Sequence, residues 1–380
     1  MRGFVSLLIL ASSFVQAADS PSLRSTEVFF AGVSYLGDYA EMDAQFPHAI
    51  ALNQGQQTSA TLDQSFLVAL TEATPRHFKL NTGLANLRRS QSLVLSLAIE
   101  QERISEEIIG DKRKLIFEVG AQILFMDFQK MSLVTNFPIE MAINHVVPVS
   151  QRADEIAQAI FKRLYLGDEQ NSGLIQRAAS MIQTVSPTAV QKLRFQVSNV
   201  EFSDNARSYL PETISETRTA QFLGQYFTAR LSKHYDLPVL PFTRGYAIGN
   251  KMAGRFANGD IYTLDVPAPD YDFSISVLDF KKSPYNKQWL YAARLGFVFQ
   301  HSANKKSYID GKYHYAVGKL ISKNHQKIDE WAAYEDALEM LLSELIEQLS
   351  EPTSSWHKQH SSSKSSYRDF NQKKEIFRES

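Results

Sequence analysis

Three histidines and two aspartates fall in one stretch of the chain, and these residue types can bind a metal ion. They are His301, His314, His325, Asp270 and Asp272. Their nitrogen and oxygen atoms would have to converge at ~2.0–2.2 Å from a zinc ion. The first two histidines could face each other across a hairpin, but no paired ligand spacing accompanies them. We therefore predict neither a metal site nor a cofactor.

A serine and a lysine with Ser-x-x-Lys spacing, together with a Ser-Asp-Asn triplet, are the motifs closest to nucleophilic chemistry. Ser302 and Lys305 form the first motif, and the triplet begins at Ser203. The pair is similar to motifs of penicillin-interacting enzymes. Here, however, the order along the chain is reversed, Lys-Thr-Gly is missing, and the Ser-x-x-Lys lies in a predicted turn. Local turn chemistry is the favoured interpretation, and we assign no catalytic residue.

A glycine-containing segment, residues 244–269, separates two strongly patterned regions. Its glycines are too widely spaced to hold a phosphate group; they are Gly245, Gly249, Gly254 and Gly259. The sequence also lacks Gly-x-Ser-x-Gly, His-Glu-x-x-His and dinucleotide-binding motifs. Long loops often carry function, so one hypothesis is a hydrolase or small-ligand-binding protein with this loop as a lid.

The elements around these residues form two blocks of the same kind. Residues 271–281, 289–300 and 307–321 alternate between apolar and polar side chains, and short polar connections between them indicate an antiparallel meander. Residues 331–349 then carry an apolar helical stripe. Residues 93–166 repeat this order more loosely, with Pro138 indicating an edge strand or a bulge. We predict an α+β fold of two similar lobes, each a mainly antiparallel sheet packed on helices.

Composition shifts set the expected boundaries. Residues 1–17 resemble a signal peptide, 18–167 form a first domain, 168–190 a linker with a connecting helix, and 191–350 a second domain. The element order suggests an internal duplication. Residues 351–380 are serine-rich and poor in aliphatic side chains, so we predict a disordered tail whose removal leaves stability unchanged. The alternative is that Phe370 and Phe377 dock onto the body or onto a partner.

Charge and cysteine content restrict the class of protein. The formal net charge of −1 gives no electrostatic footprint for nucleic acid. The chain has no cysteine, which excludes a disulfide framework and thiolate chemistry. An exported chain of 380 residues without disulfides fits a bacterial periplasm, or secretion, and no later stretch is apolar enough to span a membrane. Peripheral membrane contact stays open.

One resemblance follows from residues 219–242, a helix leading to a short strand that closes on Pro-Val-Leu-Pro, and from the Pro269-Asp270-Tyr271 start of the meander. This order is similar to the periplasmic α/β domain of the TolB amino-terminal region, the curli-secretion lipoproteins and flagellar assembly protein T. The lipid-modified cysteine of the curli family is absent. The resemblance implies a non-enzymatic role in cell-envelope assembly, with an envelope protein as partner. We predict that the partner binds at sheet edges or at the third strand of the meander, through Tyr308, Tyr313 and Tyr315.

The first prediction concerns export. Arg2, an apolar core and the small Ala17 place cleavage before Ala18. Intact-mass measurement of protein secreted by a bacterial host should therefore show loss of the first 17 residues. Soluble protein that keeps Met1 would contradict the prediction.

Overall fold

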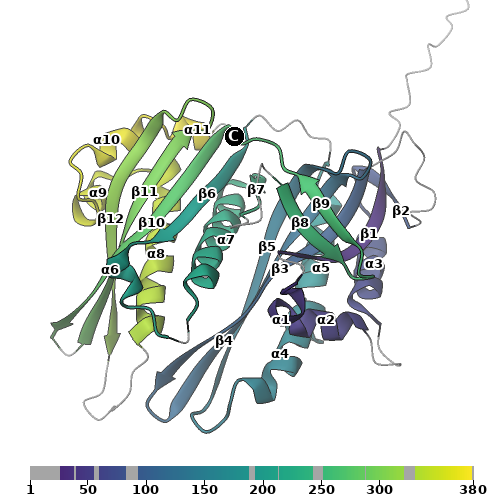
Figure 1. Ribbon diagram of the computed structural model, residues 1–380, viewed down its shortest axis with the longest axis horizontal. Helices are drawn as coiled ribbons and strands as arrows, with labels where there is room; N and C mark the ends of the chain where they lie inside the picture. Colours follow the sequence, from purple (N-terminus) through teal and green to yellow (C-terminus); the bar gives the residue numbers. More distant parts are fainter. Residues whose placement is uncertain are drawn as a thin grey trace, which may run out of the picture.

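The computed structural model describes residues 26–37, 40–54, 60–82, 93–187, 193–212, 214–242, 251–286, 288–320 and 330–378. The predicted signal peptide and His325 lie outside these residues. The fold is α+β with two sheets in two lobes, as the sequence predicts (Figure 1). Among the described residues, no helix combines the length and the apolar character needed to cross a membrane.

Lobe 1 is a seven-stranded sheet with five helices on one face. Alternation of apolar side chains builds its long strands, and Thr61 with Gln64 forms a capping box that begins the third helix. Its elements from the first part of the chain are β1 (Thr26–Leu36), α1 (Met42–Gln45), α2 (Pro47–Gln54), α3 (Leu62–Ala73), β2 (Phe78–Asn81), β3 (Leu93–Ile109), β4 (Lys112–Asp127), β5 (Ser132–Pro148), α4 (Asp154–Leu166) and α5 (Leu174–Thr184).

Lobe 2 is a five-stranded sheet whose two long helices, α7 (Glu216–Tyr235) and α8 (Glu330–Ser350), lie toward lobe 1. Helix α7 contacts both sheets, and Figure 1 shows it between them. The elements of lobe 2 are β6 (Phe195–Phe202), α6 (Asp204–Arg207), α7 (Glu216–Tyr235), β7 (Val239–Leu240), β10 (Tyr271–Tyr285), β11 (Gln288–His301), β12 (Ser307–Leu320), α8 (Glu330–Ser350), α9 (Ser354–His360), α10 (Ser366–Asn371) and α11 (Glu375–Arg378).

The two lobes share one topology. Strand order is β2-β1-β3-β4-β5 in lobe 1 and β7-β6-β10-β11-β12 in lobe 2. In each lobe the first strand is parallel to its two neighbours, and the last three strands form the predicted antiparallel meander. Pro138 lies on β5, which pairs with β9 only at Ser132 and is therefore nearly an edge strand, as predicted. This common order supports the duplication hypothesis, and the duplication itself stays a prediction.

The segment expected to be a lid is in part a hairpin of the other lobe. Strands β8 (Lys251–Phe256) and β9 (Ile261–Asp265) follow β7 in the chain but join the sheet of lobe 1, where β8 also pairs with β1. Met252, Tyr262 and Leu264 are buried there in a small core. The lid prediction is therefore wrong for residues 251–265, because alternate side chains of this hairpin are apolar and lobe 1 offers an apolar face. Residues 244–250 lie outside the described part.

The connecting helix also belongs to lobe 1. Leu174, Ile175, Ala178, Ala179 and Ile182 of α5 are buried in the same core as α3 and α4. The expected linker, residues 168–190, is therefore integrated into the first lobe over this helix. The apolar stripe of α5 explains the result, since exposing it to water would cost the free energy of burial.

The C-terminal segment is ordered, which corrects the prediction of a disordered tail. Residues 354–378 form three short helices that cover the apolar end of lobe 2 (Figure 1). Trp356, Phe370 and Phe377 are buried in the main core of that lobe, and Phe377 stacks on Phe195. The alternative that Phe370 and Phe377 dock onto the body is the one observed. Few aromatic residues suffice here because each buries a large apolar area.

The second prediction concerns this docking. Phe370 is 0% exposed, so Phe370→Ala should lower the free energy of unfolding by about 3–5 kcal/mol. The control is Tyr367→Ala in the same helix, because Tyr367 is 39% exposed and its loss should cost much less. Urea denaturation measures both. An unchanged midpoint for Phe370→Ala would show that the tail does not pack on the body in solution.

Candidate functional site

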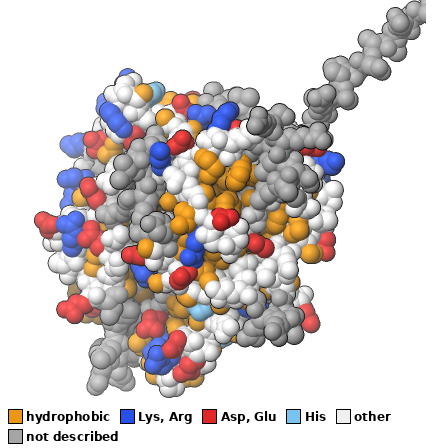
Figure 2. Space-filling view, turned by 45° about the vertical axis from the view of Figure 1, so that its right-hand side comes forward, with side chains coloured by type: hydrophobic (Ala, Val, Ile, Leu, Met, Phe, Trp, Pro, Cys, Tyr) orange, Lys and Arg blue, Asp and Glu red, His pale blue; other side chains and the backbone are white. Residues whose placement is uncertain are grey.

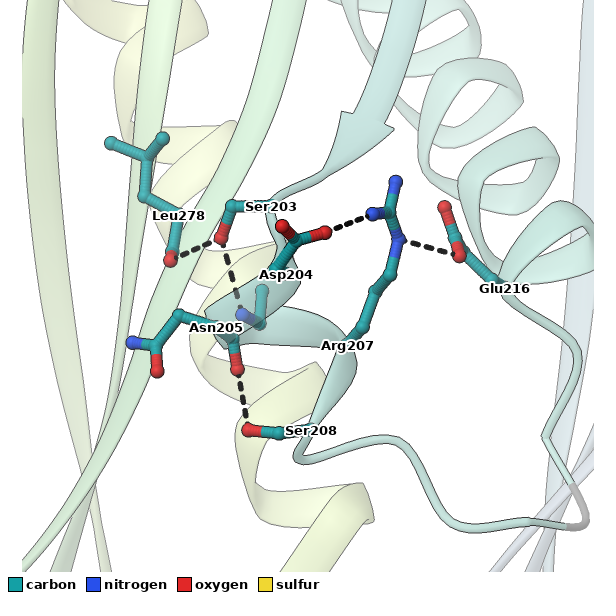
Figure 3. A network of polar contacts seen from close by, with 8 residues as sticks. Ser203, Asp204, Asn205, Arg207, Ser208, Glu216 and Leu278 are labelled. Carbon is teal, nitrogen blue, oxygen red and sulfur yellow. Dashed lines mark hydrogen bonds and ion pairs between the residues drawn. The ribbon is translucent and has the colours of Figure 1, made fainter.

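The Ser-Asp-Asn triplet has a structural role (Figure 3). The Ser203 hydroxyl accepts a hydrogen bond from the backbone N–H of Ala206 at 3.2 Å and donates one to the carbonyl of Leu278 at 2.6 Å. It thereby begins helix α6 and ties it to β10. Arg207 of the same helix pairs with Asp204 and Glu216. The favoured interpretation as local turn chemistry is confirmed for this triplet.

The Ser-x-x-Lys motif lies at the other end of β10. Its residues form the turn between β11 and β12, where the backbone N–H of Ser302 donates to the carbonyl of Asp270. Lys305 Nζ lies 3.4 Å from the carboxylate of Asp272, which is buried and also accepts from Gln300. Ser203 instead adjoins Val277, so the two motifs do not form one site.

The histidines do not converge. His301 contacts the ring of Tyr271, and His314 lies opposite Arg294 farther along the hairpin, 6.1 Å from the ring of His360. No group of three or more His, Asp or Glu residues within the described ranges is placed to hold a metal ion.

The three tyrosines predicted to bind a partner all contact the chain's own C-terminal segment. The Tyr315 ring stacks on His360, and Lys373 Nζ lies 4.1 Å from the ring centroid of Tyr308. Tyr313 is 1% exposed, and its hydroxyl shares a hydrogen bond with Ser366, which is also 2.8 Å from Nδ1 of His357. A backbone bridge between Tyr313 and Ser361 covers part of the β12 edge. This surface is therefore occupied within the protein itself.

The most distinctive polar site lies between the lobes. Two adjoining cavities of about 380 and 410 Å³ separate the sheet of lobe 1 from helices α7 and α8 of lobe 2; we call them together the interlobe cleft. Strands β3, β4 and β5 form one wall, and Phe222 of α7 and Glu335 of α8 are among the residues that line both cavities. Eight residues of the smaller cavity carry carboxyl groups: Glu100, Glu106, Glu107, Glu118, Glu140, Glu335, Asp336 and Glu339.

Ion pairs cross the cleft and hold the lobes together. The Arg103 guanidinium lies between Glu118 at 2.9 Å and Glu335 of the opposite lobe, and its Cζ is 3.8 Å from the ring centroid of Phe222. In the same way Arg230 of lobe 2 pairs with Glu140 of lobe 1 at 3.3 Å. A third contact joins Lys319 to Glu107 at 3.1 Å, and Lys319 also pairs with Asp336. The seam between the lobes is thus largely ionic.

Glu100 begins a buried hydrogen-bond chain at the back of the cleft. Its Oε1 accepts from Gln122 Nε2 at 2.9 Å, and Gln122 Oε1 accepts from Asn136 Nδ2 at 2.8 Å. The same amide of Asn136 also donates to the carbonyl of Val239 in lobe 2. Glu100 is 6% exposed, and its Oε2 has no hydrogen-bond partner within the described part of the chain. A buried polar atom without a partner carries a desolvation cost that a ligand can remove.

Burial alters the acidity of these carboxyl groups. Desolvation raises the pKa of Glu100 to about 8, although the hydrogen bond from Gln122 opposes the shift. Desolvation and the neighbouring Glu335 and Glu118 raise the pKa of Glu339 to about 8 as well, against the effect of Arg103. Burial also raises the pKa of Glu118 and Glu140. At neutral pH, Glu100 and Glu339 are therefore mainly protonated.

The sequence analysis missed this site, and a partial signal for it was present. The second face of β4 carries Glu118 and Gln122 between apolar neighbours, which predicts a polar face but not what covers it. Glu100 follows an apolar run at a β-bulge, where the register shifts between Ile99 and Gln101. Alternation places Glu100 on the same face as Val94 and Ala98, but it does not show that helices of lobe 2 cover that face.

Elsewhere the surface carries mixed charge. Figure 2 shows Lys and Arg side chains interspersed with Asp and Glu over one face, with hydrophobic side chains gathered in one area of it. The described residues of this face form no continuous basic patch and offer no electrostatic basis for binding nucleic acid there.

Comparisons with known proteins give weak structural similarity. No protein-family model and no curated protein match the sequence. Among solved structures, a minor lipoprotein from Acinetobacter baumannii is 10% identical with a TM-score of 0.23, over 42% of this chain and 91% of that one. A lipoprotein from Neisseria meningitidis is 13% identical with a TM-score of 0.17, over 41% and 95%. A protein from Xanthomonas campestris is 14% identical with a TM-score of 0.23, over 43% and 85%.

Similarities at this level do not establish a shared function. None of these three proteins is named as a member of the families that the sequence resembles, so that resemblance stays an expectation.

The third prediction is that Glu100 makes stability depend on pH. The carboxyl ionises near pH 4.5 in the unfolded chain but near pH 8 in the folded protein. Its contribution to stability is therefore complete below pH 4.5 and is lost as the pH rises toward 8. Glu100→Gln keeps an acceptor for Gln122 and cannot ionise, so its thermal midpoint should fall less between pH 5 and 8.5 than that of the wild type.

The control for this experiment is Glu72→Gln, which changes an exposed glutamate on α3. Its pH profile should follow the wild type. If Glu100→Gln gives the same slope as both of these proteins, Glu100 is not the buried acid that the structure indicates.

Proposed function

We propose that this chain is an exported, non-enzymatic protein of the cell envelope that acts by binding another envelope protein, and that the interlobe cleft is the binding site. One observation carries the assignment of the site. The cleft is lined by elements of both lobes, and it contains a buried carboxyl oxygen of Glu100 that has no hydrogen-bond partner among the residues that the structure describes. Binding there would satisfy that group and would join the two lobes.

The structural contacts of residues in the two serine motifs favour binding over catalysis. Ser203 begins a helix, and Lys305 pairs with the buried Asp272, so both already have structural partners. The contacts of the three tyrosines indicate where a partner does not bind. Because the C-terminal segment covers Tyr313, we move the expected binding surface from the third strand of the meander to the cleft.

A second candidate is a small-ligand-binding protein. The hydrolase variant of this hypothesis needed a lid at residues 244–269, and the β8–β9 hairpin packs in lobe 1 instead. Cavity volumes of about 380 and 410 Å³ nevertheless fall in the range of small-molecule sites, ~300–1,000 Å³. Both candidates place the ligand in the interlobe cleft. They differ in whether that ligand is part of a protein or a free small molecule.

The fourth prediction tests the location of protein binding. Val146 is 63% exposed on β5, two residues beyond Asn144 of the cleft wall, whereas Val68 is 56% exposed on α3 in the helical layer on the other side of lobe 1. A photo-crosslinking amino acid at position 146 should trap a defined envelope protein in living cells. The same group at position 68 should not.

Crosslinks of equal yield from both positions, or from position 68 alone, would place the binding surface elsewhere. Mass spectrometry of the adduct identifies the partner, and thermal denaturation of each variant checks that it has folded.

A further inference from the structure

The charged groups of the interlobe cleft are unevenly paired. The described cations that line the smaller cavity or pair across the seam are each bound to a carboxylate: Arg103, Arg230, Lys319 and Lys114 pair with Glu118 or Glu335, Glu140, Asp336 and Glu107. Arg218, which lines the larger cavity, is exposed and forms no ion pair among the described residues. Two carboxyl groups that line the cavity, those of Glu100 and Glu339, form no ion pair with any described residue. One belongs to β3 of lobe 1 and the other to α8 of lobe 2.

The cleft already binds guanidinium groups in a repeated way. The Arg103 guanidinium lies over the ring of Phe222, and that of Arg230 lies 5.0 Å from the ring centroid of Tyr226. Each is held at its edge by carboxylates from the opposite lobe. An aromatic face with a carboxylate beside it is the arrangement that binds organic cations in proteins.

The size of the cavity also indicates an organic cation. Its carboxyl groups are distributed over β3, β4, β5 and α8 around a volume of about 380 Å³. A ligand of several atoms can contact such separated groups, whereas a metal ion needs its oxygen ligands within ~2.0–2.6 Å. Glu100, which lines both cavities, offers a buried Oε2 acceptor that has no hydrogen-bond partner among the described residues.

We propose that the interlobe cleft binds an organic cation, an ammonium or guanidinium group, between Glu100 of lobe 1 and Glu339 of lobe 2. This inference rests on the proposed function, since it names the chemistry that the cleft recognises. Because the bound cation contacts both lobes, its binding stabilises their closed arrangement. The cation comes from a lysine or arginine side chain of the partner protein or from a free polyamine.

Binding is coupled to proton release. Burial raises the pKa of both carboxyl groups to about 8, so each gives up its proton to solvent when the cation binds. The groups that face Glu100 are Gln122 of β4, Glu140 of β5 and Gln225 of α7. Those that face Glu339 are Glu118, Arg103, Glu335 and Asp336. A cation that stays charged over this range therefore binds more tightly as the pH rises from 6.5 to 8.5.

The experiment is calorimetric titration of the mature protein with two probes that carry a guanidinium group, which keeps its charge across this range. One is agmatine, a free diamine analogue, and the other is a capped five-residue peptide with two arginines. At least one should bind, with an affinity at pH 8.5 about tenfold or more above that at pH 6.5. Preference for the peptide indicates a partner's side chain as the natural ligand, and preference for agmatine indicates a free polyamine.

Variants locate the site. Glu100→Gln and Glu339→Gln should each weaken binding by about tenfold and reduce its pH dependence, because each removes one ionisable acceptor. Glu72→Gln on the far surface is the matched control and should bind as the wild type does. Circular dichroism and the thermal midpoint show whether each variant is folded. If Glu100→Gln does not fold, Glu339→Gln decides the matter.

Three outcomes would overturn the inference: no binding of either probe at pH 8.5, unchanged binding by folded Glu100→Gln and Glu339→Gln, or competition by magnesium chloride at an ionic strength at which sodium chloride has no effect. These outcomes are separate from the test of the proposed function. If position 146 crosslinks to a partner but neither cation binds, only the inference of a cation site is contradicted. If a cation binds but crosslinking does not differ between positions 146 and 68, only the assignment of a protein partner is contradicted.

Discussion

The guanidinium of Arg103 joins the two lobes at the interlobe cleft. It projects from the sheet of lobe 1 and meets Glu118 of its own sheet, Glu335 of the opposite lobe and the ring of Phe222. A charge in such a position is tolerated only when it is well paired, because desolvation is costly. The ion pairs of Arg230 and Lys319 repeat the arrangement along the seam. Together they make an interface that is ionic where most domain cores are apolar.

Each lobe is completed by a segment from elsewhere in the chain. The β8–β9 hairpin leaves the sequence of lobe 2 and covers an apolar part of the sheet of lobe 1, opposite the helices. The C-terminal helices return to cover the β12 end of lobe 2. Leu240 of β7 lies in the same small core as the hairpin, so apolar burial as well as ion pairing connects the lobes. The two lobes are thus similar in topology and dependent on each other in packing.

The cleft results from a change from apolar to polar side chains along one face of the lobe 1 sheet. Near the hairpin that face carries Val94, Leu124 and Leu133 in an apolar core. Farther along the same strands it carries Glu100, Gln122 and Asn136, joined in one hydrogen-bond chain. Helices α7 and α8 approach this second region with polar residues, and they leave space instead of close packing. A binding site at the boundary between two folding units is a common outcome of such an arrangement.

The sequence by itself determined the local structure and the class of fold. Alternation over residues 271–300 and 115–126 predicts the strands, and the stripe after residue 330 predicts the last long helix. Periodicity also predicts one core for Trp289, Phe297, Leu338 and Leu345; the last three are buried together, and Trp289 is partly buried against them. These features depend on period and propensity within a few residues, which is information that a single sequence contains.

Only the tertiary structure decided where the hairpin, the tail and the carboxyl groups lie. Periodicity shows that a side chain has an apolar or a polar face, but not which distant surface will cover it. Phe370 and Phe377 have no convincing period, and their burial depends on a groove that the sheet and helices of lobe 2 form together. In the sequence, Glu100 follows the apolar run that ends at Ile99, and nothing nearby distinguishes it from an exposed charge. Its raised pKa arises because helices of lobe 2 cover this polar part of the sheet face, and a long-range contact of that kind has no signature in local sequence.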